Sequence, residues 1–241
     1  MKILVIGSCT KTKIFKNQSR LKCEDIKLKE DLNFYLKKYP NFSCKASIMY
    51  RGMQHISILE AIRSLGKIAK IDYYIISAGF GLISKNQQIP NYDCSFNKMS
   101  EKEILERSKK LEILKDFKKL LLKKYDFVYL ALGKKYLQSI SSWKDVIKIP
   151  AIVFYPVKKE NFFALKADTK IVSLFSKFGY KIHGTKGFKG DLLKIIAKNI
   201  LRAKYPLEKL TQIFTNQHEL LEFIRSDLLK ADKSIFYLIS Q

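Results

Sequence analysis

Short, continuously apolar runs alternate along this chain with longer stretches in which apolar residues recur every three or four positions. The apolar runs are too short for buried helices and are rich in Ile, Val and Tyr, as expected for strands that are covered on both faces of a sheet. Five strands are predicted on this basis, at Ile3–Gly7, Ser47–Tyr50, Tyr73–Ala78, Phe127–Ala131 and Ala151–Tyr155.

The longer stretches have the pattern of amphipathic helices with lysines on their outer faces. Ser100 followed by Glu103 forms a capping box, which predicts a helix that begins at Glu101. Because strands and helices alternate, we expect an α/β fold with a mostly parallel or mixed central sheet flanked by helices. The predicted helices are Asp25–Lys38, Ile56–Ile68, Glu101–Lys124 and Asp191–Lys204.

The sequence has one candidate domain boundary, at Pro206. Beyond it, residues such as Leu210, Phe214 and Leu221 have the spacing of one or two amphipathic helices. The sequence therefore predicts an α/β domain over residues 1–205, which would carry catalysis or DNA binding, and a C-terminal helical extension over residues 206–241.

The net charge of the chain indicates which class of partner it binds. The 46 Lys and Arg residues exceed the 22 Asp and Glu residues, which leaves a formal net charge of +24. A chain this basic favours a polyanionic partner, and DNA is the partner that we expect. No run reaches the roughly 18 apolar residues that a membrane span needs, and the N-terminus lacks a signal-peptide pattern, so we expect a cytoplasmic protein without a membrane partner.

The metal-ligating residue types are scattered. The four cysteines (Cys9, Cys23, Cys44 and Cys94) form no CxxC pair and are interpreted as reduced thiols. The three histidines (His55, His183 and His218) are equally far apart, so neither a zinc site nor a Ser-His-Asp triad has local support. We expect no metal and no cofactor.

Ligands of such sheets bind beyond the carboxyl ends of the strands. The loops after residues 7, 50, 78 and 131 should therefore surround one crevice. In the first loop, Ser8, Cys9, Lys11 and Lys13 are candidates for holding a phosphate or a base edge, although a solvated basic turn has the same composition. Cys9 fits a buried filler thiol better than a nucleophile, because no basic partner can be assigned to it.

The middle loops supply aromatic and acidic candidates. Tyr50 and Arg51 suit base stacking and phosphate binding. Two glycines surround Phe80, and Gly79 would allow close approach of a ligand to the backbone. The loop that returns after Pro90 presents Tyr92, Asp93 and Ser95, of which Asp93 is the candidate for chemistry on a nucleotide. An Asx-turn formed by Asp93 is the alternative.

The last loops add basic residues. Lys134 and Tyr136 follow the fourth strand, where a phosphate and a base could be held. The glycine-rich segment 184–190 precedes the helix predicted at Asp191, so its backbone amides with Lys186 and Lys189 are candidates for a phosphate anchor. An ordinary glycine-rich helix entry is the alternative.

The order of four segments resembles a known bacterial domain family. These segments are Gly7–Lys13, Tyr50–Gly52, Ser77–Leu82 with Tyr92-Asp93, and Leu132–Tyr136. They resemble a "C-S-K-x-K … L-S-A-x-x-G-L … P-Y-D" pattern over roughly residues 1–160. That family is similar to the YaaA peroxide-stress DNA-binding proteins and, more remotely, to a domain of archaeosine synthase. The chain departs from the pattern in having Gly79 and Phe80 where the family often has Lys and His.

Within this superfamily, the size and basicity of the chain most resemble the Brig-type anti-phage DNA glycosylases, which excise glucosylated hydroxymethylcytosine. The resemblance implies a DNA N-glycosylase that flips a modified base out of the duplex. Asp93 would then stabilise the positive charge that develops on the sugar and orient the attacking water. A lysine that attacks the sugar as a Schiff-base nucleophile ranks lower, because the many lysines are expected to be exposed.

Two other functions compete with base excision. One is a non-catalytic nucleic-acid-binding protein of the YaaA kind that acts in stress protection. The other is an enzyme that makes or exchanges modified guanine bases in RNA. An Asp93→Asn variant separates the first from a glycosylase, because only a glycosylase would lose its function.

Overall fold

The computed structural model describes residues 1–15, 21–158, 160–216, 218–220 and 222–223. Its centre is a six-stranded sheet in the order β10-β9-β8-β1-β4-β5. All neighbouring strands run parallel except β4 and β5, which are antiparallel. The strands are β1 (Lys2–Ser8), β4 (Lys70–Ser77), β5 (Gly81–Ser84), β8 (Phe127–Ala131), β9 (Ala151–Val153) and β10 (Phe162–Ala164).

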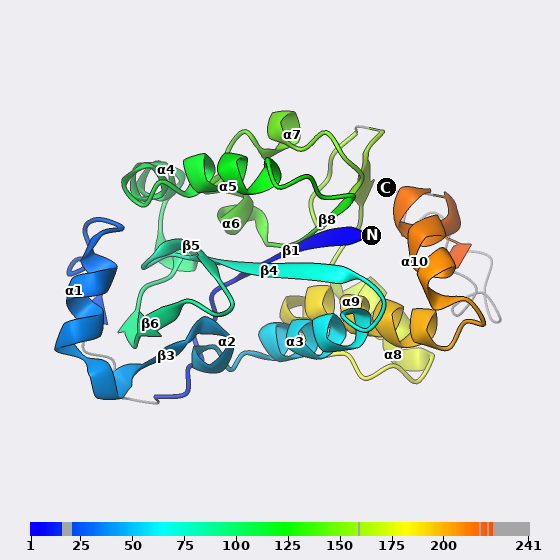
Figure 1. Ribbon diagram of the computed structural model, residues 1–241, viewed down its shortest axis with the longest axis horizontal. Helices are drawn as coiled ribbons and strands as arrows, with labels where there is room; N and C mark the ends of the chain where they lie inside the picture. The colour runs from blue at the N-terminus through cyan, green and yellow to red at the C-terminus, as the bar shows by residue number, and fades with distance from the viewer. Residues whose placement is uncertain (16–20, 159, 217, 221, 224–241) are drawn as a thin grey trace.

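Helices cover both faces of this sheet. One face carries α4 (Glu101–Lys110), α5 (Ile113–Leu121), α6 (Lys134–Gln138) and α7 (Trp143–Val146), which lie above the sheet in Figure 1. The other face carries α3 (Met53–Leu65), α8 (Thr169–Lys177) and α9 (Gly184–Leu201). This three-layer arrangement confirms the predicted α/β fold with a mostly parallel central sheet.

Smaller elements gather at the end of the sheet where the parallel strands terminate. A parallel pair joins β2 (Leu21–Lys22) to β7 (Tyr92–Asp93), and an antiparallel pair joins β3 (Ser43–Lys45) to β6 (Gln88–Pro90). Two helices, α1 (Asp31–Lys38) and α2 (Ala46–Met49), lie beside them at the left of Figure 1. Short 3-10 helices occur at Pro40–Phe42 and Phe96–Lys98.

The predicted C-terminal helical region begins as expected with α10 (Pro206–Thr215). Its residues Leu210, Ile213 and Phe214 are buried, and the Phe214 ring stacks on Phe127 of β8 with centroids 4.1 Å apart. The part of the prediction that falls on residues 224–241 lies outside the described residues. Among the helices described, none is both long enough and apolar enough to cross a membrane.

Two predicted elements are wrong in type or extent. The predicted strand at Ser47–Tyr50 is instead the single helical turn α2, because the amides of Ala46 and Ser47 bond across to the Gln87 and Lys85 carbonyls and end the β3 pairing. The predicted helix Glu101–Lys124 is two helices, since Glu112 has a φ of 52° and breaks the run between α4 and α5. The capping box at Ser100 is confirmed.

Two helix starts differ from the prediction by more than one turn. The helix predicted from Asp25 begins only at Asp31, whose carboxylate accepts the amides of Lys27 and Leu28 and closes a turn before the helix. The helix predicted from Asp191 begins at Gly184, so the glycine-rich segment forms its first two turns rather than a loop. Glycine suits this place because a Cβ at Gly190 would lie 2.3 Å from the Gln54 carbonyl oxygen of α3.

Candidate active site

The carboxyl ends of β1, β4 and β8 bring several of the candidate residues together. Cys9 follows β1, and its amide donates to the Ile76 carbonyl of β4 at 2.9 Å. Tyr136 lies in α6, five residues beyond the end of β8, and its hydroxyl is 3.1 Å from the Cys9 sulfur. The Ser95 hydroxyl is 3.4 Å from the same Tyr136 oxygen. Segments far apart in the sequence thus meet at this edge, as the strand order predicts.

A chain of buried hydroxyl groups crosses the floor of this edge. The Ser77 oxygen accepts the amides of Gly79 and Phe80 at 3.1 and 3.0 Å, which leaves its proton for the Tyr92 oxygen at 2.7 Å. Tyr92 can then donate to the Tyr50 oxygen at 2.6 Å. Burial raises the pKa of Tyr50 and of Tyr92 well above its ordinary range, so both phenols stay protonated.

Lys13 is the only lysine among the described residues that is buried, with 7% of its surface exposed. Its backbone pairs with Tyr50, and its Nζ lies 4.4 Å from the centre of the Tyr92 ring. Burial lowers the pKa of Lys13, although the nearby Cys9 and Asp93 act in the opposite direction. A lysine in this setting has more uncharged amine at neutral pH than a surface lysine has.

Asp93 is exposed and lies close enough to Lys13 for its charge to raise the lysine pKa. It ends the short strand β7, opposite Lys22 of β2. The next pair along these two strands is Cys23 and Cys94, which form a disulfide. The prediction of four reduced thiols is therefore wrong for these two cysteines: the β2–β7 pairing places them side by side, although 71 positions separate them in the sequence. Cys9 and Cys44 are free.

The predicted aromatic platforms are interior side chains. Tyr50, Phe80 and Tyr92 are each 1% exposed and Tyr136 is 4% exposed, so none of them presents a ring face to solvent in this structure. Gly79 is held against the Tyr92 ring, where a Cβ would lie 2.9 Å from two ring carbons. Two of these residues contact Lys13: Tyr50 pairs with its backbone, and the Tyr92 ring lies under its Nζ.

The predicted phosphate-binding residues are spread more widely. Lys11, Arg51, Lys134 and Lys186 are exposed, and Ser8 is partly exposed. Lys189 is partly buried within α9, and its burial lowers its pKa. Because the segment 184–190 is helical, the loop predicted before that helix does not exist, although Lys186 lies in the first turn of α9.

Arg107 is an important residue that the sequence did not single out. From α4, its guanidinium donates to the carbonyl oxygens of Ala78, Cys23 and Ile26, the last two at 3.0 and 3.1 Å. It therefore joins the end of β4 to the segment that carries the disulfide. In the sequence Arg107 has the appearance of one more basic residue on the outer face of a helix, so no local pattern reveals this role.

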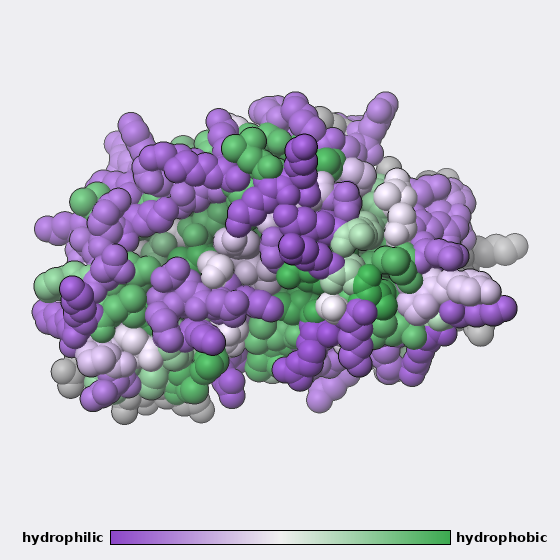
Figure 2. All heavy atoms as spheres, viewed as in Figure 1, coloured by the Kyte–Doolittle hydropathy of each residue, from purple (hydrophilic) through white to green (hydrophobic). Residues whose placement is uncertain are grey.

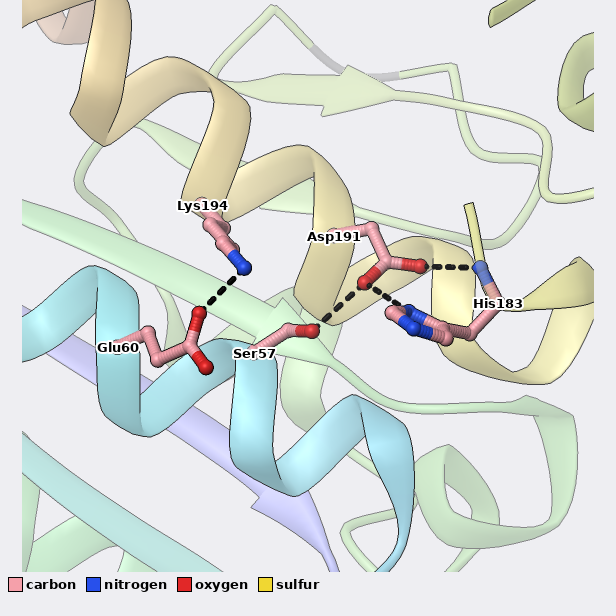
Figure 3. Close-up of polar contacts among 5 residues, drawn as sticks. All are labelled: Ser57, Glu60, His183, Asp191 and Lys194. Atoms are coloured by element: carbon pink, nitrogen blue, oxygen red, sulfur yellow. Dashed lines mark hydrogen bonds and ion pairs between the residues drawn. The ribbon is translucent and has the colours of Figure 1, made fainter. Parts of the chain in front are cut away.

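A second polar cluster joins α3 to the start of α9 (Figure 3). The buried Asp191 carboxylate accepts the Ser57 hydroxyl at 2.6 Å, and it accepts the His183 amide at 2.7 Å and the ring Nδ1 at 2.9 Å. Lys194 and Glu60 form an ion pair one turn along the same helices. Because Ser57 donates to Asp191 and not to His183, its hydroxyl is not activated as in a hydrolase triad. The cluster ties the two helices together.

Comparison with known proteins gives a family match over slightly less than half of the chain. No curated protein matches the chain. Residues 36–153 match the sequence profile of a protein family described as "Family of unknown function (DUF6884)". That span contains Tyr50, Ser77, Asp93 and Tyr136 of the candidate site but begins after Cys9 and Lys13.

Proposed function

We propose that this protein is a DNA N-glycosylase that removes a modified base and leaves an abasic site. The observation that carries the proposal is the placement of Lys13, a buried lysine with a lowered pKa, within electrostatic reach of the exposed carboxylate of Asp93. Both residues lie at the carboxyl edge of the sheet in a chain whose net charge is +24. Perturbed titratable groups at such an edge are typical of catalytic sites.

The two residues can divide the reaction between them. The uncharged Nζ of Lys13 attacks C1′ of a flipped nucleotide, and the glycosidic bond breaks with its electron pair passing to the base. Asp93 accepts one Nζ proton and passes it to the leaving base. The C1′–O4′ bond then opens to a protonated Schiff base, with O4′ taking a proton from water. Hydrolysis of the Schiff base releases the lysine and leaves the abasic sugar.

This assignment raises the lysine route above direct attack by water. The argument against a lysine nucleophile is that lysines are exposed and therefore charged, and that argument does not apply to Lys13. In the alternative route Asp93 orients a water molecule and stabilises the positive charge on the sugar. The two routes differ in one observable, since only the first forms a covalent adduct between protein and DNA.

A non-catalytic DNA-binding protein is the second candidate function. It is favoured by the burial of Tyr50, Phe80, Tyr92 and Tyr136, because a flipped base would need an open aromatic face on which to stack. Such a protein would retain DNA binding in an Asp93→Asn variant and would release no base from any DNA.

The deciding experiment measures abasic sites in a panel of duplex DNAs by alkaline strand cleavage. The panel contains plain, uracil-containing, hydroxymethylated and glucosyl-hydroxymethylated cytosine DNA. We expect wild-type protein to cleave one modified DNA and to be trapped on it covalently by borohydride. Asp93→Asn should lower the rate by about 100-fold or more, and Lys13→Met should abolish trapping.

The matched control is Lys67→Met, which makes the same substitution at an exposed lysine beyond the far end of α3. It should cleave and trap like the wild type. Abasic sites without any trapped adduct would overturn the lysine route and leave water as the nucleophile. Binding to every DNA without release of any base would overturn the glycosylase proposal and support the binding protein.

A further inference from the structure

A pocket of about 280 Å³ lies on another face of α6 from the candidate active site. Tyr136 faces Cys9, whereas Lys134 and Gln138, one turn apart on α6, line the pocket. The remaining walls come from α4 with Glu101, from α7 with Trp143 and Lys144, and from Tyr155 after β9. This volume is close to the lower end of the range of small-ligand sites.

The pocket combines aromatic rings with cations. Lys144 Nζ lies 5.6 Å from the centre of the Trp143 ring and 5.5 Å from that of Tyr155. Trp143 is buried, with 4% of its surface exposed, so only Tyr155, which is partly exposed, can offer a ring face. Aromatic rings beside ammonium groups suit a ligand that has both a flat ring and an anionic group, as a nucleotide does.

Hydrogen-bond acceptors complete the pocket. Gln138 donates its amide nitrogen to the Glu101 carboxylate, which fixes the orientation of the amide because a carboxylate only accepts. Gln138 Oε1 is buried and has no hydrogen-bond partner within the part of the chain that the structure describes. This unpaired acceptor favours a ligand with an amino group, such as cytosine or adenine.

The pocket continues into a larger groove over α4 and α5. Leu105 and Ser141 line both hollows, and the groove has a volume of about 790 Å³. Lys109, Lys118 and Lys119 line it from the two helices, together with Lys115, which is paired with Glu112. Figure 2 shows hydrophilic side chains gathered over these helices. A lysine-lined groove that leads to an aromatic pocket has the form of a path for a nucleic-acid backbone.

We propose that this groove and pocket bind a single strand of nucleic acid. The phosphates follow the lysines of α4 and α5, and one base, with an amino group, enters the pocket against Tyr155, close to the buried Trp143. The inference shares with the proposed function only the class of partner. Because its test measures binding and not base release, the two proposals can fail separately.

The chain contains a single tryptophan, so the fluorescence of Trp143 reports directly on the pocket. We would titrate full-length protein with a six-nucleotide oligo-dC and follow this emission. Saturable quenching is expected, and if four lysines contact phosphates, an increase from 50 to 200 mM NaCl should weaken binding about 50-fold. Oligo-dT, which lacks the amino group, should bind more weakly.

Two variants test the two halves of the site separately. Lys118→Glu with Lys119→Glu changes only exposed side chains and should lower the affinity for oligo-dC at least tenfold. Tyr155→Ala should lower it about tenfold through lost stacking. Lys67→Glu, far from the groove in the chain and exposed, should change the affinity less than twofold.

Two results would overturn binding of the strand in this groove and pocket, and a third would contradict the binding of a base. One is binding of a labelled oligo-dC, measured by anisotropy, with no change in Trp143 emission, because the strand would then bind elsewhere. The other is unchanged affinity in the double charge-reversal variant. Quenching by inorganic phosphate alone to the same extent as by oligo-dC would also contradict a base-binding pocket.

Discussion

At the scale of single residues, His55 is an uncharged imidazole held inside the core. Its ring Nε2 donates to the Ser47 carbonyl at 3.2 Å, so Nδ1 accepts the Tyr73 hydroxyl at 2.9 Å. Burial lowers the pKa of His55 from 6.5 to about 4. Between these values the unfolded chain binds a proton that the folded protein excludes, so stability falls as the pH falls from 6.5 to about 4.

His55 should therefore make the fold acid-sensitive. We expect the free energy of unfolding to fall by about 2 kcal/mol between pH 7 and pH 5 through this residue alone, as measured by urea unfolding at both pH values. His55→Gln should be less stable at pH 7 but lose less stability between the two pH values. His218→Gln, which alters an exposed histidine, should keep the wild-type loss. An equal loss in wild type and His55→Gln would contradict this assignment.

The second residue-scale prediction concerns the pH dependence of Lys13. Because burial lowers the pKa of Lys13 below 10.5, the uncharged amine gains population as the pH rises toward this lowered value. The rate of borohydride trapping on a substrate DNA should therefore rise about tenfold per pH unit until that pKa is reached. The measurement is the trapping rate from pH 6 to pH 10.

Asp93→Asn provides the internal check on this profile. The Asp93 charge raises the pKa of Lys13, so its removal should shift the midpoint of the remaining trapping to lower pH. A shift to higher pH, or a midpoint at the value of an ordinary lysine, would show that another amine forms the adduct.

At the scale of elements, local sequence determines some parts of the fold and tertiary contact determines the others. The strands β1 and β8 are continuous apolar runs, and α4 starts with a capping box, so all three elements can be predicted from the local sequence. The α2 turn forms because of its bonds to Lys85 and Gln87 on the strand connection beyond β5. No window of the local sequence contains that information.

The candidate site divides in the same way. The loops that carry Cys9, Tyr92 and Tyr136 were predictable, because parallel strands end at one edge of a sheet. The burial of their aromatic rings depends on tertiary packing, and the Arg107 contacts with three carbonyls join segments that are 29 or more positions apart. Residue type and spacing cannot distinguish a buried tyrosine from one that faces a ligand.

The close packing of α3 on α9 gives an element-scale prediction. A Cβ at Gly190 would lie 2.3 Å from the Gln54 carbonyl oxygen. Gly190 and Gln54 belong to the backbones of α9 and α3, so neither can shift without moving its helix. Gly190→Ala should therefore lower the free energy of unfolding by about 1–3 kcal/mol, as measured by urea unfolding. Gly133→Ala, whose Cβ would meet nothing within 4 Å, should cost less than about 1 kcal/mol. Equal costs would show that the helices can separate freely.

The disulfide gives a second prediction at this scale. Cys23–Cys94 closes a loop across 71 positions and anchors the strand that carries Asp93. Cys94→Ser should lower the free energy of unfolding by about 2–4 kcal/mol. In thermal unfolding, a reducing agent should lower the Tm of wild type and of Cys44→Ser but leave that of Cys94→Ser unchanged. A wild-type Tm that does not respond to complete reduction would contradict a stabilising role.

At the scale of the whole molecule, the excess positive charge destabilises the compact state that the hydrophobic core stabilises. Helix α10 is packed on the sheet through Phe214 and Phe127, so this segment adds to the same core as the α/β region. Around that core, 46 basic residues face 22 acidic ones. Like charges at this density repel one another and lower the stability of the compact state, and a bound polyanion relieves that repulsion.

This balance predicts opposite effects of salt on the free protein and on its complex with DNA. Raising NaCl from 20 to 300 mM screens the self-repulsion and should raise the Tm of the free protein. The same change should shrink the additional rise in Tm that duplex DNA produces, because the salt competes with the basic side chains for the phosphates. Differential scanning fluorimetry with and without a 20-base-pair duplex measures both effects. If DNA raises the Tm equally at the two salt concentrations, the net charge of +24 does not drive DNA binding. If salt leaves the Tm of the free protein unchanged, its positive charges are too far apart to repel one another.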